Sequence, residues 1–186
     1  MPTPTLPEAR SFTGKLYSLT PGGYQLVSMS VPMNELQSQY TDGWLTLNHD
    51  GIAFRFNYRD TKDGHPRYSV TAQIPNNAHD GGQLEISRNG YLGLYKVSTN
   101  DQLWHVLPDS RNLPDAKALL KQTRWSEVFG NDPEEERLKE CLKECLIPVL
   151  MHCDQGRSIK LMADEPYLST TEGSEPRLFI DIEGEL

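Results

Sequence analysis

Three cysteines and five histidines are the residues of this sequence best suited to chemistry. Cys141, Cys145 and His152 lie in a segment with helical periodicity, where they would point within about 40° of one another. Cys141 and Cys145, one turn apart, could share a metal ion. His152 would lie about 10.5 Å further along the axis, too far for zinc bonds of ~2.0–2.3 Å unless Pro148 breaks the helix. The spacing therefore favours cysteines that pack as small apolar side chains, and we expect no metal and no other cofactor.

The histidines do not form a recognisable catalytic motif. His49, His65 and His79 fall in predicted turns, whereas His105 and His152 lie near apolar positions and are the better candidates for catalysis. A hydrolase needs a nucleophile, a histidine and a carboxylate in contact. The chain contains no GxSxG, HExxH, CxxC or P-loop pattern that would supply such a set. We therefore assign no catalytic residue.

Aromatic and basic side chains in the middle of the chain form a second candidate site. Trp, Tyr and Arg are enriched at the energetic hot spots of protein interfaces. If Trp44 and Arg55 share the outer face of a sheet, they would form a partner-binding patch with Arg59 and Arg67. Alternatively, a helix covers that face and Trp44 belongs to a second core. The sequence does not choose between these two interpretations.

Negative charge is concentrated near the C-terminus. The chain has 18 Lys and Arg against 26 Asp and Glu, which gives a net charge of −8. Residues 164–186 contribute 1 − 7 = −6 of this charge, and Asp164, Glu165, Glu172 and Glu175 lie in one polar loop. Such a loop would attract a basic partner, although a solvated surface loop is the simpler interpretation. An acidic chain without a basic run is not expected to bind nucleic acid.

Length and composition predict one soluble domain. A chain of 186 residues typically forms a single core. The first ten residues, MPTPTLPEAR, do not resemble a secretory signal, and no stretch approaches the roughly 18 apolar residues of a membrane span. Three cysteines within one predicted helix are not a disulfide framework. We therefore expect a cytoplasmic protein.

Period-two alternation predicts strands over the first hundred residues. Residues 12–19 and 23–31 form a first hairpin candidate. The stretch GWLTLNHDGIAFRFNY predicts a tight hairpin at Asp50-Gly51 in which Leu45 faces Phe56. A second tight hairpin, at Asn89-Gly90, would pair Leu84 with Tyr95. Further strands are predicted over residues 67–74, 102–107, 157–163 and 177–183.

The periodicity changes after Pro108. A helix is predicted over residues 113–129, followed by a second helix over 131–151 that begins at Asn131 or Asp132. The second helix has one apolar face that would cover the sheet, made of Leu138, Cys141, Leu142, Cys145, Leu146 and Val149.

We therefore predict an α+β fold. An antiparallel meander of about eight strands, curled into a half-barrel or barrel, would be followed by two helices and two closing strands. Residues 1–10 would form a flexible N-terminal arm. Residues 11–186 would form the domain, with a β-rich part over 11–108, a helical part over 113–152 and C-terminal strands over 157–183.

These observations favour a non-catalytic protein that binds another protein, as an inhibitor, immunity factor or adaptor does. It would use a sheet face and an acidic C-terminal surface, with the contact residues Trp44, Arg55, Arg59, Arg67, Asp164, Glu165, Glu172 and Glu175. One alternative is a small-molecule-binding barrel whose inner face encloses a cavity, lined by Leu45, Phe54, Phe56, Tyr68 and Tyr95. The other is an enzyme with an unrecognised His/Cys site. No nucleic-acid or membrane binding is expected.

Overall fold

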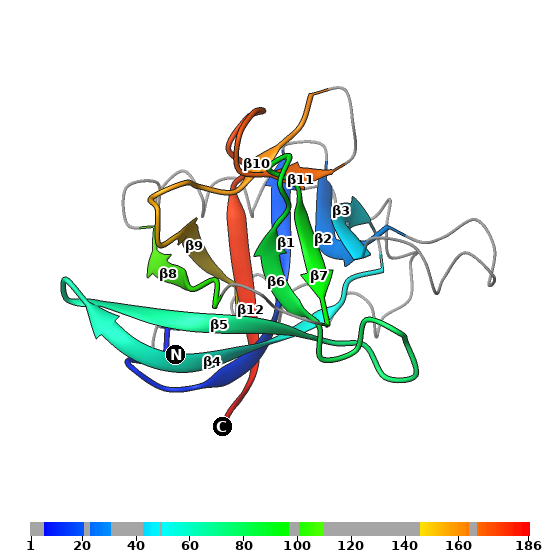
Figure 1. Cartoon of the computed structure of the whole chain (residues 1–186). Helices are drawn as coiled ribbons and strands as arrows, with labels where there is room; N and C mark the ends of the chain where they lie inside the picture. The colour runs from blue at the N-terminus through cyan, green and yellow to red at the C-terminus, as the bar shows by residue number, and fades with distance from the viewer. Residues whose placement is uncertain are drawn as a thin grey trace.

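A computed structural model describes residues 6–20, 23–30, 43–48, 50–96, 101–109, 146–163 and 167–186. These residues form strands and connections (Figure 1). The strands are β1 (Phe12–Thr20), β2 (Gly23–Met29), β3 (Gly43–Asn48), β4 (Ala53–Lys62), β5 (His65–Gln73), β6 (Gln83–Ile86), β7 (Leu92–Tyr95), β8 (Trp104–Pro108), β9 (Ile147–Cys153), β10 (Lys160–Leu161), β11 (Leu168–Ser169) and β12 (Leu178–Glu185).

Ten of these strands form one antiparallel sheet that closes on itself twice. The strand order is β12-β9-β8-β5-β4-β1-β2-β3-β7-β6, with the additional pairings β12–β1 and β5–β6. The first additional pairing closes a ring of β1, β4, β5, β8, β9 and β12. The second closes a ring of β1, β2, β3, β7, β6, β5 and β4. Strands β10 and β11 pair separately. In Figure 1, β4 and β5 run across the lower part of the view while β1 and β12 run nearly vertically.

Strand β1 makes the double closure possible because it pairs with three other strands. Residues 12–18 pair with β12 along one edge. Along the other edge, residues 12–15 pair with β4 and residues 17–20 pair with β2. The register with β12 shifts between Thr13 and Gly14, and such a bulge bends a strand. The bend lets one strand contribute to both rings.

One apolar core fills the inside of the closed sheet. The rings of Phe12 and Phe56 stack with centroids 4.7 Å apart, and Tyr68 meets Phe12 edge-on at 5.5 Å. Trp104 is fully buried, and its Nε1–H donates to the carbonyl of Leu84 at 3.0 Å. Because Trp104 lies on β8 and Leu84 on β6, this hydrogen bond joins the two rings through their common interior.

Several sequence predictions are confirmed. Strands β1 and β2 form the first predicted hairpin, with Thr20 opposite Gly23. Strands β5, β8 and β12 match the strands predicted over residues 67–74, 102–107 and 177–183. The strand predicted over residues 157–163 is reduced to the two residues of β10.

The predicted hairpin at Asp50-Gly51 is wrong, because β3 and β4 are not neighbours. Strand β3 pairs with β2 and β7, whereas β4 pairs with β1 and β5. The connection packs on β2 instead of turning back: Ile52 N–H donates to the carbonyl of Val27 at 3.1 Å. A Cβ on Gly51 would lie 2.3 Å from Leu26 Cδ2. Glycine is therefore required here for close packing of the connection against Leu26.

The hairpin at Asn89-Gly90 exists, but its register differs from the prediction by one residue. Leu84 lies opposite Leu94, not opposite Tyr95. The loop consists of residues 88–90, and Gly90 has a φ of 88°. A three-residue loop that ends on a glycine in the left-handed region replaces the expected two-residue turn and shifts the pairing.

The α+β prediction is also wrong: none of the residues that the structure describes is helical. Residues 147–151, expected to end the second helix, belong to β9, which lies between β8 and β12. The apolar residues of this segment fit both periods, and Leu146 and Val149 are buried as expected. The helix predicted over residues 113–129, and residues 131–145 of the second, lie outside the described residues.

The described part of the N-terminal arm packs against the sheet. Leu6 contacts the apolar core, and the carbonyl of Pro7 accepts a hydrogen bond from the Tyr68 hydroxyl at 3.3 Å. Arg10 pairs with Glu185 at 3.3 Å.

Across the residues that can be described, no helix is long and apolar enough to cross a membrane.

The seam between β1 and β12 contains two glycines that should respond differently to substitution. A Cβ on Gly14 would lie 2.4 Å from the carbonyl oxygen of Asp181, whereas a Cβ on Gly184 would meet nothing closer than Thr13 Oγ1 at 3.6 Å. We expect Gly14→Ala to lower the free energy of unfolding by about 1–3 kcal/mol, the usual cost of overpacking. Gly184→Ala should be neutral or stabilise by up to about 1 kcal/mol, because alanine has less unfolded-state entropy. Urea unfolding of both variants checks this, and equal losses would contradict it.

The same seam should produce a pH dependence of stability. Burial, followed by the charge of Glu183, raises the pKa of Asp181 above its ordinary value of 3.8, while Lys15 opposes the shift. The folded state therefore holds this proton more tightly than the unfolded chain, and the resulting stabilisation is present below pH 3.8 and lost as pH rises through the raised pKa. Asp181→Asn should thus become more stable relative to the wild type as pH increases to neutrality. Thermal melts across this range test it, with the exposed Asp63→Asn as control; parallel trends would contradict it.

Candidate functional site

The outer faces of β5, β8 and β9 bring Arg67, His105 and His152 into one row. Arg67 is opposite His105, and His105 is opposite His152. The two imidazole rings stack with centroids 4.8 Å apart and planes 24° apart. Their sequence neighbours Trp104 and Cys153 point into the core, so the row lies on the other face of the sheet. We call Asp60, Arg67, His105, His152 and Asp154 the histidine cluster.

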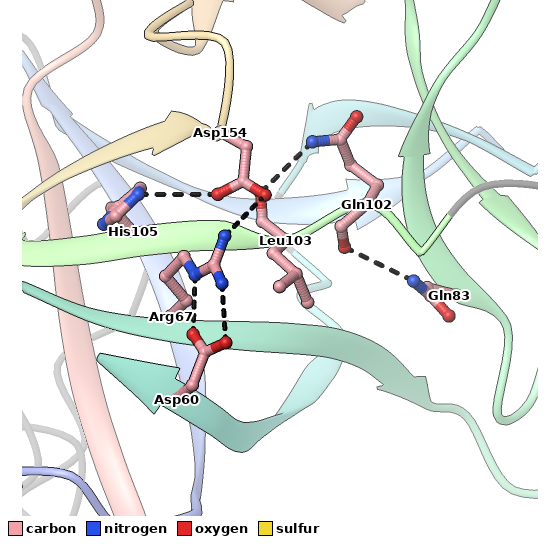
Figure 2. A network of polar contacts seen from close by, with 7 residues as sticks. All are labelled: Asp60, Arg67, Gln83, Gln102, Leu103, His105 and Asp154. Carbon is pink, nitrogen blue, oxygen red and sulfur yellow. Dashed lines mark hydrogen bonds and ion pairs between the residues drawn. The ribbon is translucent and has the colours of Figure 1, made fainter. Parts of the chain in front are cut away.

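Arg67 joins two carboxylates within this cluster (Figure 2). Its Nε donates to Asp60 Oδ1 at 2.6 Å and its Nη2 to Asp60 Oδ2 at 2.5 Å. Its Nη1 donates to Asp154 Oδ2 at 3.2 Å. The hydrogen bond from Arg67 is the main cause that lowers the pKa of Asp60, and the hydrogen bond to Asp60 is the main cause that raises the pKa of Arg67. Each of the three guanidinium nitrogens therefore donates to a carboxylate, and the Arg67 side chain is only 18% exposed.

His105 is 8% exposed and lies beside Asp154. Its Nε2 is 3.5 Å from Asp154 Oδ1, which is long for a hydrogen bond. Burial is the main cause that lowers the pKa of His105; His152 and Arg67 act in the same direction, and Asp154 opposes them. Among the described residues, three buried atoms of the cluster have no hydrogen-bond partner: His105 Nδ1, His152 Nδ1 and Asp154 Oδ1.

The histidine cluster lacks a nucleophile within the part of the chain that is described. Cys153 is fully buried in the core on the opposite face of β9. Ser158 lies opposite His152 in an isolated bridge, but its hydroxyl donates to Glu175 at 2.7 Å. Covalent catalysis requires a nucleophile in hydrogen-bond contact with the base. The described part of the cluster therefore lacks the nucleophile that acyl transfer by a covalent intermediate requires.

Three aromatic residues from separate segments form a second site, which we call the aromatic cluster. Trp44 stacks on Tyr91 with centroids 4.9 Å apart and planes only 2° apart. The ring of Tyr167 meets both of these rings edge-on, with its centroid 5.3 Å from that of Trp44 and 6.0 Å from that of Tyr91. All three side chains are half-buried. Backbone bridges from Thr46 to Tyr167 and from Tyr91 to Ser169 hold the segments together.

A buried carboxylate lies in the same row of the sheet as Trp44. Trp44 is opposite Gly93 on β7, and Gly93 is opposite Glu85 on β6. A Cβ on Gly93 would lie 3.0 Å from the Tyr95 ring and 3.3 Å from Trp44 Cδ1, so glycine leaves room for both rings. Glu85 is 8% exposed, and its Oε1 has no hydrogen-bond partner among the described residues. A buried carboxylate of this kind would favour a positive charge nearby.

The acidic C-terminal segment packs directly against the aromatic cluster. Thr170 N–H donates to the carbonyl of Gly90 at 2.8 Å. A Cβ on Gly90 would lie 2.5 Å from Thr171 Cγ2, so the two segments touch. Glu172 follows immediately and is exposed, as is Glu175. Asp164 and Glu165 lie outside the described residues.

The structure places the predicted contact residues that it describes in three separate locations. Trp44 lies beside the segment that carries Glu172, as described above. Arg55 and Arg59 are exposed on β4, which does not pair with the strand of Trp44. Arg67 belongs to the histidine cluster and is paired with two carboxylates. The proposed patch of Trp44 with the arginines is therefore not one continuous row on the sheet.

Sequence reasoning missed the partners that complete both clusters. Tyr91, Tyr167 and Glu85 complete the surroundings of Trp44, and Asp154 completes those of His105. None belongs to a local motif, because each reaches its partner through strand pairing. The strand character of residues 147–153 was the signal that would have placed His152 opposite His105. The assignment of those residues to a helix concealed it.

No protein-family model matches this chain, and no solved structure matches it. A stretch of 75 residues is 31% identical to a protein named C4-dicarboxylate-binding protein DctB from Bacillus subtilis (strain 168). The match covers 40% of this chain but only 21% of that relative. This similarity does not assign the chain to a family.

The ion pairs of Arg67 should stabilise the fold more than exposed pairs do. Arg67→Met removes the only donor that the described structure shows for both Asp60 and Asp154 at once. We expect a clear decrease in the urea midpoint, because Asp154 is left half-buried and without its main partner. Arg10→Met is the matched control: its pair with Glu185 has side chains 70% and 56% exposed, and such pairs contribute little. Equal midpoints for the two variants would contradict this role of Arg67.

Proposed function

We propose that this protein acts by binding another protein, and that a basic surface of the partner docks on the aromatic cluster and the adjacent acidic segment. One observation carries the proposal. The ring of Tyr167 meets the ring of Trp44 edge-on, with centroids 5.3 Å apart, and Tyr167 begins the described part of the acidic segment, residues 167–175. An aromatic anchor and an acidic segment that are far apart in the sequence therefore share one place on the molecule.

The chemistry of this place suits a cationic side chain. Stacked and edge-on rings provide rigid apolar area that loses little side-chain entropy on binding, and aromatic faces attract Lys and Arg. Glu172 is exposed on the segment that packs against Gly90, and Glu85 is a buried carboxylate in the row of Trp44. The rim charge would accelerate the encounter, whereas the aromatic anchor would slow dissociation.

The two alternatives have less support in the geometry. The inner face around Phe54, Phe56 and Tyr68 is filled by side chains in mutual contact, as a core is, and not arranged as the wall of a cavity. A dicarboxylate ligand, suggested by the name of the partial relative, would need unpaired cationic groups, and in the histidine cluster Arg67 is already engaged by Asp60 and Asp154. Covalent catalysis would need a nucleophile that the histidine cluster does not contain among the described residues. We place the encounter in the cytoplasm, as the composition predicts.

The aromatic anchor can be tested by dissociation kinetics. A partner would first be captured by cross-linking in a lysate of the source cell, identified by mass spectrometry and purified. Trp44→Ala should then increase the dissociation rate by at least about tenfold, the effect of losing roughly 1.4 kcal/mol at a hot spot. Arg55→Ala, on β4, is the control and should change the rate little. A dissociation rate that is unchanged in Trp44→Ala would contradict docking on the aromatic cluster.

The acidic segment can be tested by association kinetics. Glu172→Gln combined with Glu175→Gln should slow association and reduce its dependence on salt, because rim charges steer the encounter. Glu8→Gln combined with Asp63→Asn removes the same charge from other exposed positions and serves as the control. If both double variants associate equally fast and with the same salt dependence, the acidic segment does not guide the partner.

A further inference from the structure

We propose that the junction of β5, β8 and β9 is an acid-sensitive latch: neutral His105 and His152 keep β8 in place, and their protonation loosens it. The junction belongs to the first ring of the sheet, whereas the proposed docking surface lies around β3 and β7. The inference is therefore independent of the proposed function.

The first argument is the way in which β8 closes its ring. On one edge, β8 pairs with β9 at five positions, from Trp104 to Pro108. On the other edge, it pairs with β5 at two positions, His105 opposite Arg67 and Trp104 opposite Tyr68. These are fewer positions than at any other junction between the described strands of this ring. The ring is therefore held by its shortest pairing at the place where a histidine lies opposite an arginine.

The second argument is the contact between the two imidazole rings. His105 and His152 lie opposite each other, with ring centroids 4.8 Å apart and planes 24° apart. Two neutral rings can stack in this way, but two imidazolium ions would bring like charges together at a buried position. Burial and a neighbouring like charge both disfavour the protonated form of a histidine. The guanidinium of Arg67, opposite His105 on β5, adds a third positive charge.

The third argument is the lack of an acceptor for the added protons. A neutral imidazole has one N–H donor, whereas both nitrogens of imidazolium are donors. Nδ1 of His105 and Nδ1 of His152 are buried and have no hydrogen-bond partner among the described residues. Asp154 lies 3.5 Å from the other nitrogen of His105, Nε2. Protonation of either ring would therefore leave a buried N–H without an acceptor, which costs free energy.

Charged and titratable side chains surround the pair (Figure 2). Burial is the main cause that lowers the pKa of His105, and His152, Arg67 and His65 act in the same direction, whereas Asp154 opposes them. Asp60 stays charged on acidification, because its hydrogen bond from Arg67 lowers its pKa. The groups from the neighbouring segments are Asp60 and Lys62 on β4, His65 and Arg67 on β5, Asp154 after β9, and Glu175, which accepts a hydrogen bond from Ser158 opposite His152.

The direction of this shift gives the direction of the pH effect. The pKa of His105 in the folded state lies below 6.5, so the unfolded chain takes up this proton first as the pH falls. The stability that neutral His105 provides is therefore complete above pH 6.5 and is lost as the pH falls through the lowered pKa. Asp181 acts in the opposite direction, because its raised pKa stabilises the folded state on acidification. A loss of stability in this interval therefore cannot come from Asp181.

Amide hydrogen exchange of the full chain tests the latch. Exchange would be measured at about pH 7.5 and about pH 5, between which histidine titrates, and corrected for the intrinsic effect of pH on exchange. We expect the amides of β8 to exchange about tenfold faster at the lower pH, the factor that corresponds to one pKa unit. The amides of the β1–β2 hairpin should change little. In an NMR titration of the same sample, the imidazole signals of His105 should titrate below pH 6.5.

Variants assign the effect to the two histidines. His105→Gln cannot take up a proton and should remove the pH dependence at β8, and His152→Gln should reduce it because the neighbouring charge is lost. The matched control is His79→Gln, which should behave as the wild type. His79 also has a buried nitrogen without a partner among the described residues, but its ring packs against Gly43.

Circular dichroism identifies any variant that does not fold. If His105→Gln fails this check, the half-buried His152→Gln and the NMR titration of the wild type decide the outcome. The proposal is overturned if the exchange of β8 does not depend on pH, or if all strands of the sheet accelerate equally. It is also overturned if the folded histidine variants keep the full acceleration, or if His105 titrates at or above pH 6.5.

Discussion

The structure depends on one constraint: the two edges of β1 must satisfy three partner strands. Its pairing with β12 closes one ring, and the division of its other edge between β4 and β2 starts the second ring. A strand with free edges would expose backbone donors and acceptors to other chains. Closure pairs these groups and encloses a single core that both rings share. The bulge at Gly14 and the close approach of Gly14 to Asp181 are local consequences of bending one strand into two rings.

Closure also decides where polar side chains can gather. The interior is filled by apolar and aromatic residues, and the side chains of Arg67, His105 and His152 lie on the outer face of the closed sheet. The histidine cluster occupies β5, β8 and β9 of the first ring, and the aromatic cluster occupies β3 and β7 of the second. Both clusters contain buried polar atoms without a partner in the described residues, on His105 and His152 in the first and on Glu85 beside the second, whereas Arg67 is paired with two carboxylates. Such atoms are expensive in folding free energy, and we interpret the one on Glu85, in the row of Trp44, as a place for a positive charge of the partner.

Closed sheets of this type place contacts between residues that are distant in the sequence. Arg67 and Asp154 are 87 residues apart, yet their side chains are 3.2 Å apart. Tyr167 reaches Trp44 because the segment that contains β11 bridges to β3 and to the residue before β7. Each cluster thus forms only when segments that are distant in the sequence have paired. Any function of either cluster therefore requires that part of the sheet to be folded.

Alternation and composition were enough to predict which side chains of several strands are buried and where charge is concentrated. Leu45, Phe54 and Phe56 point into the core as their alternation predicts, and Glu172 and Glu175 are exposed on the acidic segment. An alternating apolar pattern is compatible with several registers and several partner strands. It could therefore not show that β3 and β4 are separated or that Leu84 lies opposite Leu94. Residues 147–151 are apolar at positions that fit a helix and a strand alike, and only pairing with β8 and β12 decided for the strand. For the same reason, the contacts of His105 with His152 and of Trp44 with Tyr167 depend on strand pairing and could not be predicted from local sequence.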